Sequence, residues 1–165
     1  MENINKLRTL WIDEPHARLS NWREFRLQNK DLDLHTLCEL TAQWWSAAPI
    51  CSISIDPYDP SSWPDVWQLL TDGDVCKYSV SLGMAYTIYY AKSNENIVIV
   101  RFFDEDKDDI YNATLINNQL LLGHTPGKVV DFKSVAPTLK IQEQWPIYTV
   151  INLIKDNTQR GKEYE

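Results

Sequence analysis

The chain changes its pattern of apolar and polar positions after about residue 91. Before that point apolar side chains recur every three or four residues, and beyond it they alternate with polar ones. A spacing near 3.6 residues is typical of amphipathic helices, and a spacing of two is typical of strands. The pattern therefore predicts an α+β fold, with N-terminal helices packed on a C-terminal antiparallel sheet of three to five strands.

The first helices are expected within an N-terminal extension and the segment that follows it. Residues 1–30 suggest short helices, interrupted at Pro15. A regular helix is predicted over 31–47, where leucine, cysteine and tryptophan side chains form one apolar stripe. Asp31 or Asp33 can cap its first turn, because a carboxylate accepts hydrogen bonds from the unpaired N–H groups there.

Three further elements are expected before the pattern changes. Residues 50–56 alternate apolar and polar side chains, which indicates a strand or an extended segment. A short helix is predicted over 63–71, and Gly73 supplies the left-handed turn that ends it. A longer helix follows at once, with Asp74 as its cap and Cys76 at its second position.

The pattern in the second half of the chain predicts a meander of short strands. Asn117-Asn118 is a typical two-residue hairpin turn between two of them. The final segment, 144–156, fits either a strand, because of its β-branched residues, or a helix, because of its Leu and Ile spacing. The expected strands are 96–104, 110–116, 119–123 and 128–132.

The length of 165 residues is typical of one domain with a sizeable core. We expect a single domain, 1–165, in three parts: an extension (1–30), a helical part (31–91) and a sheet part (96–156). The formal charge of −7 argues against a nucleic-acid partner, since phosphate binding requires a basic face. The N-terminus lacks the apolar stretch of a signal peptide, and no apolar run approaches membrane-spanning length, so no membrane association is expected.

The candidate metal ligands do not form a known pattern. Cys38, Cys51 and Cys76 are widely spaced, unlike the paired cysteines of zinc sites or a disulfide framework. The acidic turn 105–109 lacks the glycine and glutamate positions of an EF-hand loop. No glycine-rich phosphate loop is present either. We therefore expect no metal and no cofactor.

Seven tryptophans are the most unusual feature of the composition. Most of them are expected in an aromatic core, because large rings gain most from burial. Tryptophan is also enriched at protein–protein interfaces. Trp11, Trp22 and Trp145 are the candidates for contact with a protein partner.

Several short motifs resemble the transglutaminase-like division of the papain-type cysteine enzymes. In that family a short helix precedes a Gly-Asp-Cys turn, and the cysteine heads a helix that faces a strand carrying histidine and a strand carrying aspartate. The resemblance covers residues 61–134. The motifs that carry it are Trp63-Pro64, Gly73-Asp74-Val75-Cys76, strand 97–104, Asn112-Ala113-Thr114 and Val130-Asp131-Phe132.

The resemblance implies a nucleophilic thiol at Cys76, since a helix N-terminus favours thiolate. The place of the histidine base is taken by Asn112, which cannot accept a proton. An inactive scaffold is therefore expected. If the chain is active, the catalytic set would be Cys76, His124 and Asp131. The alternatives are a packed thiol at Cys76, a turn residue at His124 and a backbone-binding carboxylate at Asp131.

The chain also resembles uncharacterised proteins of tailed bacteriophages, in particular T4-like phages of cyanobacteria, in its small size, acidity and segments such as AQWWSAAPI. That resemblance implies a virion component or assembly factor, located in the host cytoplasm or incorporated in the virion. The expected function is a non-catalytic, protein-binding component, with virion subunits or a host protein as partner. The alternatives are a cysteine hydrolase or acyltransferase using Cys76, and a small phage regulator of a host enzyme.

Overall fold

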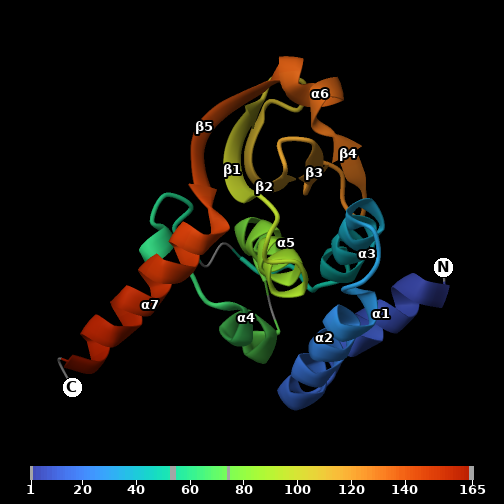
Figure 1. Cartoon of the computed structure of the whole chain (residues 1–165), viewed down its shortest axis with the longest axis vertical. Helices are drawn as coiled ribbons and strands as arrows, with labels where there is room; N and C mark the ends of the chain where they lie inside the picture. The colour runs from blue at the N-terminus through green and yellow to red at the C-terminus, as the bar shows by residue number, and fades with distance from the viewer. Residues whose placement is uncertain (1, 53–54, 74, 164–165) are drawn as a thin grey trace.

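A computed structural model describes residues 2–52, 55–73 and 75–163 of the chain. Within these ranges, seven α-helices, most of them N-terminal, pack on one five-stranded antiparallel sheet (Figure 1). The α+β class and the strand number predicted from the sequence are therefore confirmed. In the described part of the chain, no helix has the length and apolar character needed to cross a membrane.

The N-terminal extension forms two helices, α1 (Glu2–Ile12) and α2 (Pro15–Asn29). Pro15 begins α2, because its fixed φ suits the first helical position. The next helix, α3 (Leu34–Ser46), lies inside the predicted range. Asp33 caps it as predicted, accepting a hydrogen bond of 3.0 Å from the backbone N–H of Thr36.

Two helices follow a short 3₁₀ turn at Pro60–Ser62. The helix α4 (Val66–Asp72) begins later than predicted, because Asp65 is its cap. Gly73 ends α4 with φ of 74°, as predicted. A side chain there would meet the guanidinium of Arg18 at 2.5 Å, so this position requires glycine for both reasons.

The long helix α5 (Lys77–Ala91) corrects one prediction, because Cys76 is its N-cap rather than its second residue. Asp74, the predicted cap, lies outside the described residues. Residues 50–56 were predicted as a strand or an extended segment, and the described ones form no regular strand but only an isolated parallel bridge between Ile50 and Val75. Residues 53 and 54 of that segment also lie outside the described part.

The four predicted strands are present. They are β1 (Ile97–Asp104), β2 (Asp109–Ile116), β3 (Leu120–Leu122) and β4 (Val129–Asp131). The sheet order is β4-β3-β2-β1-β5, with antiparallel neighbours throughout. Asn117 and Asn118 have φ of 53° and 54°, as the predicted two-residue hairpin turn requires.

Both interpretations of residues 144–156 hold in part. Strand β5 (Leu139–Pro146) ends inside this range, and helix α7 (Ile147–Glu163) begins at once. The start of β5 was not predicted, because β5 is an edge strand whose side chains are mostly exposed and polar. A short helix α6 (Phe132–Val135) and a 3₁₀ turn (Ala136–Thr138) connect β4 to β5.

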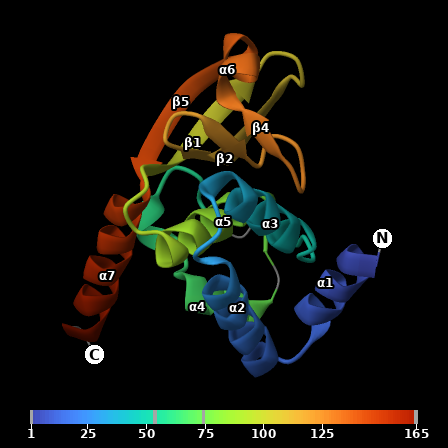
Figure 2. The same cartoon turned by 45° about the vertical axis from the view of Figure 1, so that its right-hand side comes forward.

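Helices α5 and α3 pack against the sheet, and α1, α2 and α4 lie beyond them (Figures 1 and 2). The hydroxyl of Thr114 on β2 donates a hydrogen bond of 2.6 Å to the carbonyl of Ser81, which fixes α5 on this inner face of the sheet. A second apolar cluster, including Val100 and Phe102, covers the outer face. On the other side of α5, Gly83 lets Trp45 pack so closely that a Cβ atom would lie 2.4 Å from its ring.

Candidate functional site

Cys76 lies at the head of α5, where the sequence placed a candidate nucleophile. Its side chain is completely buried. The hydroxyl of Ser79 accepts a hydrogen bond of 2.9 Å from the backbone N–H of Cys76 and lies 3.5 Å from its sulfur. This serine thus closes the first turn of the helix around the thiol. A substrate would have to displace surrounding residues to reach the sulfur.

Asn112, at the position that resembles the family's base, is paired with an arginine. Arg101 lies directly opposite it across β1 and β2, and its guanidinium donates a hydrogen bond of 3.0 Å to Asn112 Oδ1. Both side chains share the face of Thr114, because residues two apart on a strand point the same way. They therefore face α5.

The Arg101–Asn112 pair is deeply buried and incompletely satisfied. Arg101 is 5% exposed and Asn112 is 4% exposed. Arg101 Nε and Asn112 Nδ2 have no hydrogen-bond partner in the described part of the structure. The guanidinium carbon lies 5.1 Å from the ring of Tyr78, in the first turn of α5, and 4.6 Å from the ring of Tyr58. A guanidinium in contact with two aromatic rings, rather than an imidazole, therefore lies beside Asn112.

His124 belongs to a different cluster. Its Nδ1 lies 2.7 Å from the hydroxyl of Tyr111 and 3.8 Å from a carboxylate oxygen of buried Asp104. Tyr111 and Asn112 are consecutive on β2 and point to opposite faces of the sheet. The structure therefore places the His124 ring with the outer-face residues. Burial lowers the pKa of His124, and Lys107 lowers it further, against the opposing effect of Asp104.

Asp131 caps the short helix α6. It accepts a hydrogen bond of 3.3 Å from the backbone N–H of Lys133, and it is exposed at the end of the edge strand β4. This is the backbone-binding role that the sequence allowed as the alternative to catalysis. His35 and His16 are both exposed, and His35 lies 3.4 Å from Glu39.

The three tryptophans expected to contact a protein partner are buried or partly buried instead. Trp11 and Trp22 are 2% and 1% exposed, and Trp145 is partly buried with its ring 5.1 Å from that of Trp63. Trp67, in contrast, is 50% exposed. A partner that recognises an indole in this conformation would therefore meet Trp67.

Arg101 is the site residue that sequence reasoning missed. The signal was present, because Arg101 interrupts an otherwise apolar run over 97–103. A charged side chain inside a buried strand requires a specific partner. The identity of that partner depends on the strand register, which pairs Arg101 with Asn112.

The comparisons with known proteins support this view of the fold. No protein-family model matches the chain, and neither does any curated protein. Among solved structures, it is similar to calcium-bound LapG of Legionella pneumophila, with a TM-score of 0.66, 13% identity, and coverage of 87% of this chain and 82% of that one. EGTA-treated LapG gives a TM-score of 0.65 at 12% identity, with coverage of 86% and 81%. The chain therefore has the transglutaminase-like, papain-type fold that its motifs predicted.

One of these similar structures, LapG of Legionella pneumophila, is calcium-bound. Across the described ranges, no three or more His, Cys, Asp or Glu side chains gather as metal ligands. Oxygen-rich clusters of this kind are what calcium requires. No step of the function proposed below involves a metal.

Proposed function

We propose that this chain is a non-catalytic, protein-binding component of a bacteriophage particle or its assembly, built on a transglutaminase-like scaffold. The observation that carries the proposal is the Arg101–Asn112 pair, which takes the place of a general base. An asparagine amide does not accept a proton at neutral pH. A guanidinium beside it also disfavours any second positive charge, including the imidazolium that cysteine catalysis would form.

The burial of Cys76 supports the same proposal. A nucleophilic thiol works from a partly exposed, electropositive position, whereas packed thiols are inert. Cys76 has the helix terminus but not the exposure. His124 bonds to Tyr111 on the outer face, and Asp131 is occupied with a helix cap, so neither is arranged around this sulfur.

Cysteine alkylation tests the inactive state of the site. Native protein is treated with iodoacetamide near neutral pH, and peptide mass spectrometry follows each cysteine separately. Cys51, which is partly exposed, serves as the internal reference, and fully buried Cys38 is the unreactive control. We expect Cys76 to react more slowly than Cys51, at a rate close to that of Cys38. Faster reaction at Cys76 than at Cys51 would overturn the proposal in favour of a cysteine hydrolase or acyltransferase.

The phage role is tested by association. Mass spectrometry of purified particles should detect the chain if it is a virion subunit, and its absence would contradict that role. Capture of one enzyme from host lysate, together with absence from particles, would support the alternative of a small regulator. The Cys76→Ser variant should retain binding in either assay, because no chemistry at the thiol is required.

A further inference from the structure

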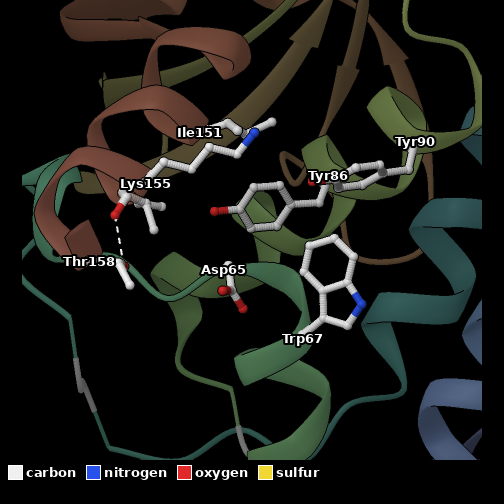
Figure 3. A pocket seen from close by; sticks show the side chains of 8 residues that line it. Asp65, Trp67, Tyr86, Tyr90, Ile151, Lys155 and Thr158 are labelled. Atoms are coloured by element: carbon white, nitrogen blue, oxygen red, sulfur yellow. Dashed lines mark hydrogen bonds between the residues drawn. The ribbon is translucent and has the colours of Figure 1, made fainter. Parts of the chain in front are cut away.

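We propose that a cavity between α4, α5 and α7 binds an arginine side chain presented by a basic protein partner. The inference rests on the proposed protein-binding function and specifies the chemistry that the partner must offer. In Figure 3, Trp67, Tyr86 and Tyr90 lie on one side of this cavity, and α7 lies across from them. The surface so defined is called the aromatic cavity below.

The size of the aromatic cavity suits one side chain. Its volume is about 260 Å³. Sites for drug-sized ligands and cofactors occupy about 300–1,000 Å³, so this one is small for a complete small molecule. Trp67 lines the cavity and is half-exposed, while Ile151 and Ile154 provide apolar surface from α7. A side chain with an apolar stem and a flat polar end fits such a lining.

The rings are held in a fixed arrangement. The centroids of Trp67 and Tyr90 are 5.4 Å apart, with the ring planes at 70°. The hydroxyl of Tyr86 donates a hydrogen bond of 2.9 Å to the carbonyl of Pro64, which fixes the edge of that ring. Aromatic faces attract cations, and guanidinium more often than ammonium. Trp67 and Tyr90 therefore offer aromatic surface to a cation, while Tyr86, which is 1% exposed, is held within the core.

The chain already places one guanidinium on this group of rings. The guanidinium carbon of Arg26 lies 4.0 Å from the ring centroid of Trp22 and 5.8 Å from that of Tyr90. The ring of Trp22 in turn contacts Trp67, with centroids 6.5 Å apart. Stacking of arginine on these aromatics is thus a contact that the fold itself uses, on the side of Tyr90 where α2 packs.

The cavity carries charges of both signs. Asp65 lines the cavity, and its Oδ1 also accepts a hydrogen bond of 2.8 Å from the backbone N–H of Gln68. The net charge of −7 steers a basic partner to the molecule as a whole. Lys155 lies on the α7 side and opposes an incoming cation. These two side chains therefore predict mutational effects of opposite sign.

The test uses two short peptides and the indole N–H signal of Trp67 in heteronuclear NMR spectra of the full chain. One peptide is N-acetyl-Gly-Arg-Gly-amide, and the other carries neutral, isosteric citrulline in place of arginine. We expect the arginine peptide to shift the Trp67 signal with a Kd of about 1 mM. The citrulline peptide should bind several-fold more weakly, because its flat side chain lacks the charge.

Charge variants decide between a cation and an anion. Asp65→Asn keeps the helix cap and should raise the Kd about threefold, while Lys155→Gln should lower it. Asp33→Asn is the matched control, since Asp33 caps α3 in the same way away from the cavity. A lower Kd for Asp65→Asn together with a higher Kd for Lys155→Gln, or equal binding of both peptides, would overturn the proposal. No shift at Trp67 with the arginine peptide would also overturn it.

A third comparison isolates the indole. Trp67→Ala should abolish binding of the arginine peptide, as followed through the shifts of neighbouring backbone amides. Tyr148→Ala removes a different exposed ring, on α7, and should leave binding unchanged. Failure of these titrations leaves the alkylation result at Cys76 unchanged, because that thiol lies at the opposite end of α5. A reactive Cys76 would contradict the proposed function even if the peptide binds, so the two failures are distinguishable.

Discussion

Arg101 carries a positive charge into the sheet, and in the described structure it has no acidic partner. Burial of an uncompensated cation is unfavourable, so the rings of Tyr58 and Tyr78 supply part of its stabilisation. Asn112 Nδ2, which has no hydrogen-bond partner in the described structure, also indicates that an acceptor is missing here. A carboxylate at position 112 would correct both faults at once.

We expect Asn112→Asp to raise the free energy of unfolding by about 1 kcal/mol at neutral pH. The guanidinium would hold the pKa of the new carboxyl below its usual value of about 3.9. The gain is therefore present above that value and is lost as pH falls through the lowered folded-state pKa. Urea denaturation at neutral and acidic pH measures it.

Asn112→Ala is the matched control for that substitution. It leaves the guanidinium without its hydrogen-bond acceptor and opens a small cavity, so it should destabilise the fold. A lower stability of the Asp variant than of the parent chain at neutral pH would show that Arg101 already has its counter-charge.

His124 provides a pH-dependent measurement. Its folded-state pKa lies below the ordinary value of about 6.5, because burial and Lys107 disfavour the charged ring. The unfolded chain therefore binds the proton more readily between the two pKa values. We expect the contribution of neutral His124 to the free energy of unfolding to be fully present above about pH 6.5. It should fall as the pH drops toward the lowered pKa.

The control for this prediction is His124→Asn, whose side-chain amide can still form a hydrogen bond with the Tyr111 hydroxyl but does not titrate. The slope of stability between about pH 7.5 and about pH 5.5 should be shallower in the variant. Equal slopes in the two proteins would assign the acid sensitivity to other groups.

At the scale of elements, one hydroxyl group joins three helices. Thr87 of α5 accepts hydrogen bonds from the indole N–H groups of Trp22 on α2, at 3.0 Å, and Trp45 on α3, at 2.8 Å. It donates its own proton to the carbonyl of Gly83 at 2.8 Å. All of these groups are buried, so their hydrogen-bonding needs are met through this one oxygen.

We expect Thr87→Val to destabilise the fold by about 2–4 kcal/mol, because two buried indole N–H groups lose their acceptor. Thr87→Ser keeps the oxygen and should cost much less. Chemical denaturation of both variants measures the difference. A valine variant as stable as the serine variant would mean that other acceptors or water replace the hydroxyl.

The sequence predicted elements best where their pattern reflects burial. Strands β1 and β2 form the centre of the sheet, and their apolar runs were evident. The start of strand β5 was not predicted, because this strand lies at the edge of the sheet and exposes side chains such as Glu143 and Gln144. The predicted helix 63–71 began too early, because Pro64 is typical of a helix start although Asp65 is the cap.

The candidate site was predictable in part for a similar reason. The position of Cys76 followed from local turn signals, and Asn112 followed from the resemblance of its strand motif. Arg101 required knowledge of which residue faces it across the sheet. The aromatic cavity required the position of α7, and the residues 144–156 that bear on it fitted two types of structure. Contacts between distant elements are what a single pattern does not encode.

At the scale of the whole molecule, the sheet presents two unlike faces. The inner face packs on α5 and carries Arg101 and Asn112, and the outer face carries its own apolar cluster with Tyr111 and His124. The aromatic cavity lies on neither face, because α4, α5 and α7 form it. The site at the head of α5 and the cavity toward its other end, proposed to bind arginine, can therefore change independently.

The anchoring of the first two helices has a consequence for biosynthesis. Trp11 donates a hydrogen bond to the carbonyl of Trp44, Arg18 to those of Leu70 and Thr71, and Trp22 to Thr87. A nascent chain emerges from the ribosome N-terminus first, so α1 and α2 are synthesised long before α5 becomes available to receive them. These two helices thus cannot complete their docking until α5 has emerged, and they stay open to chaperones and proteases in the interval.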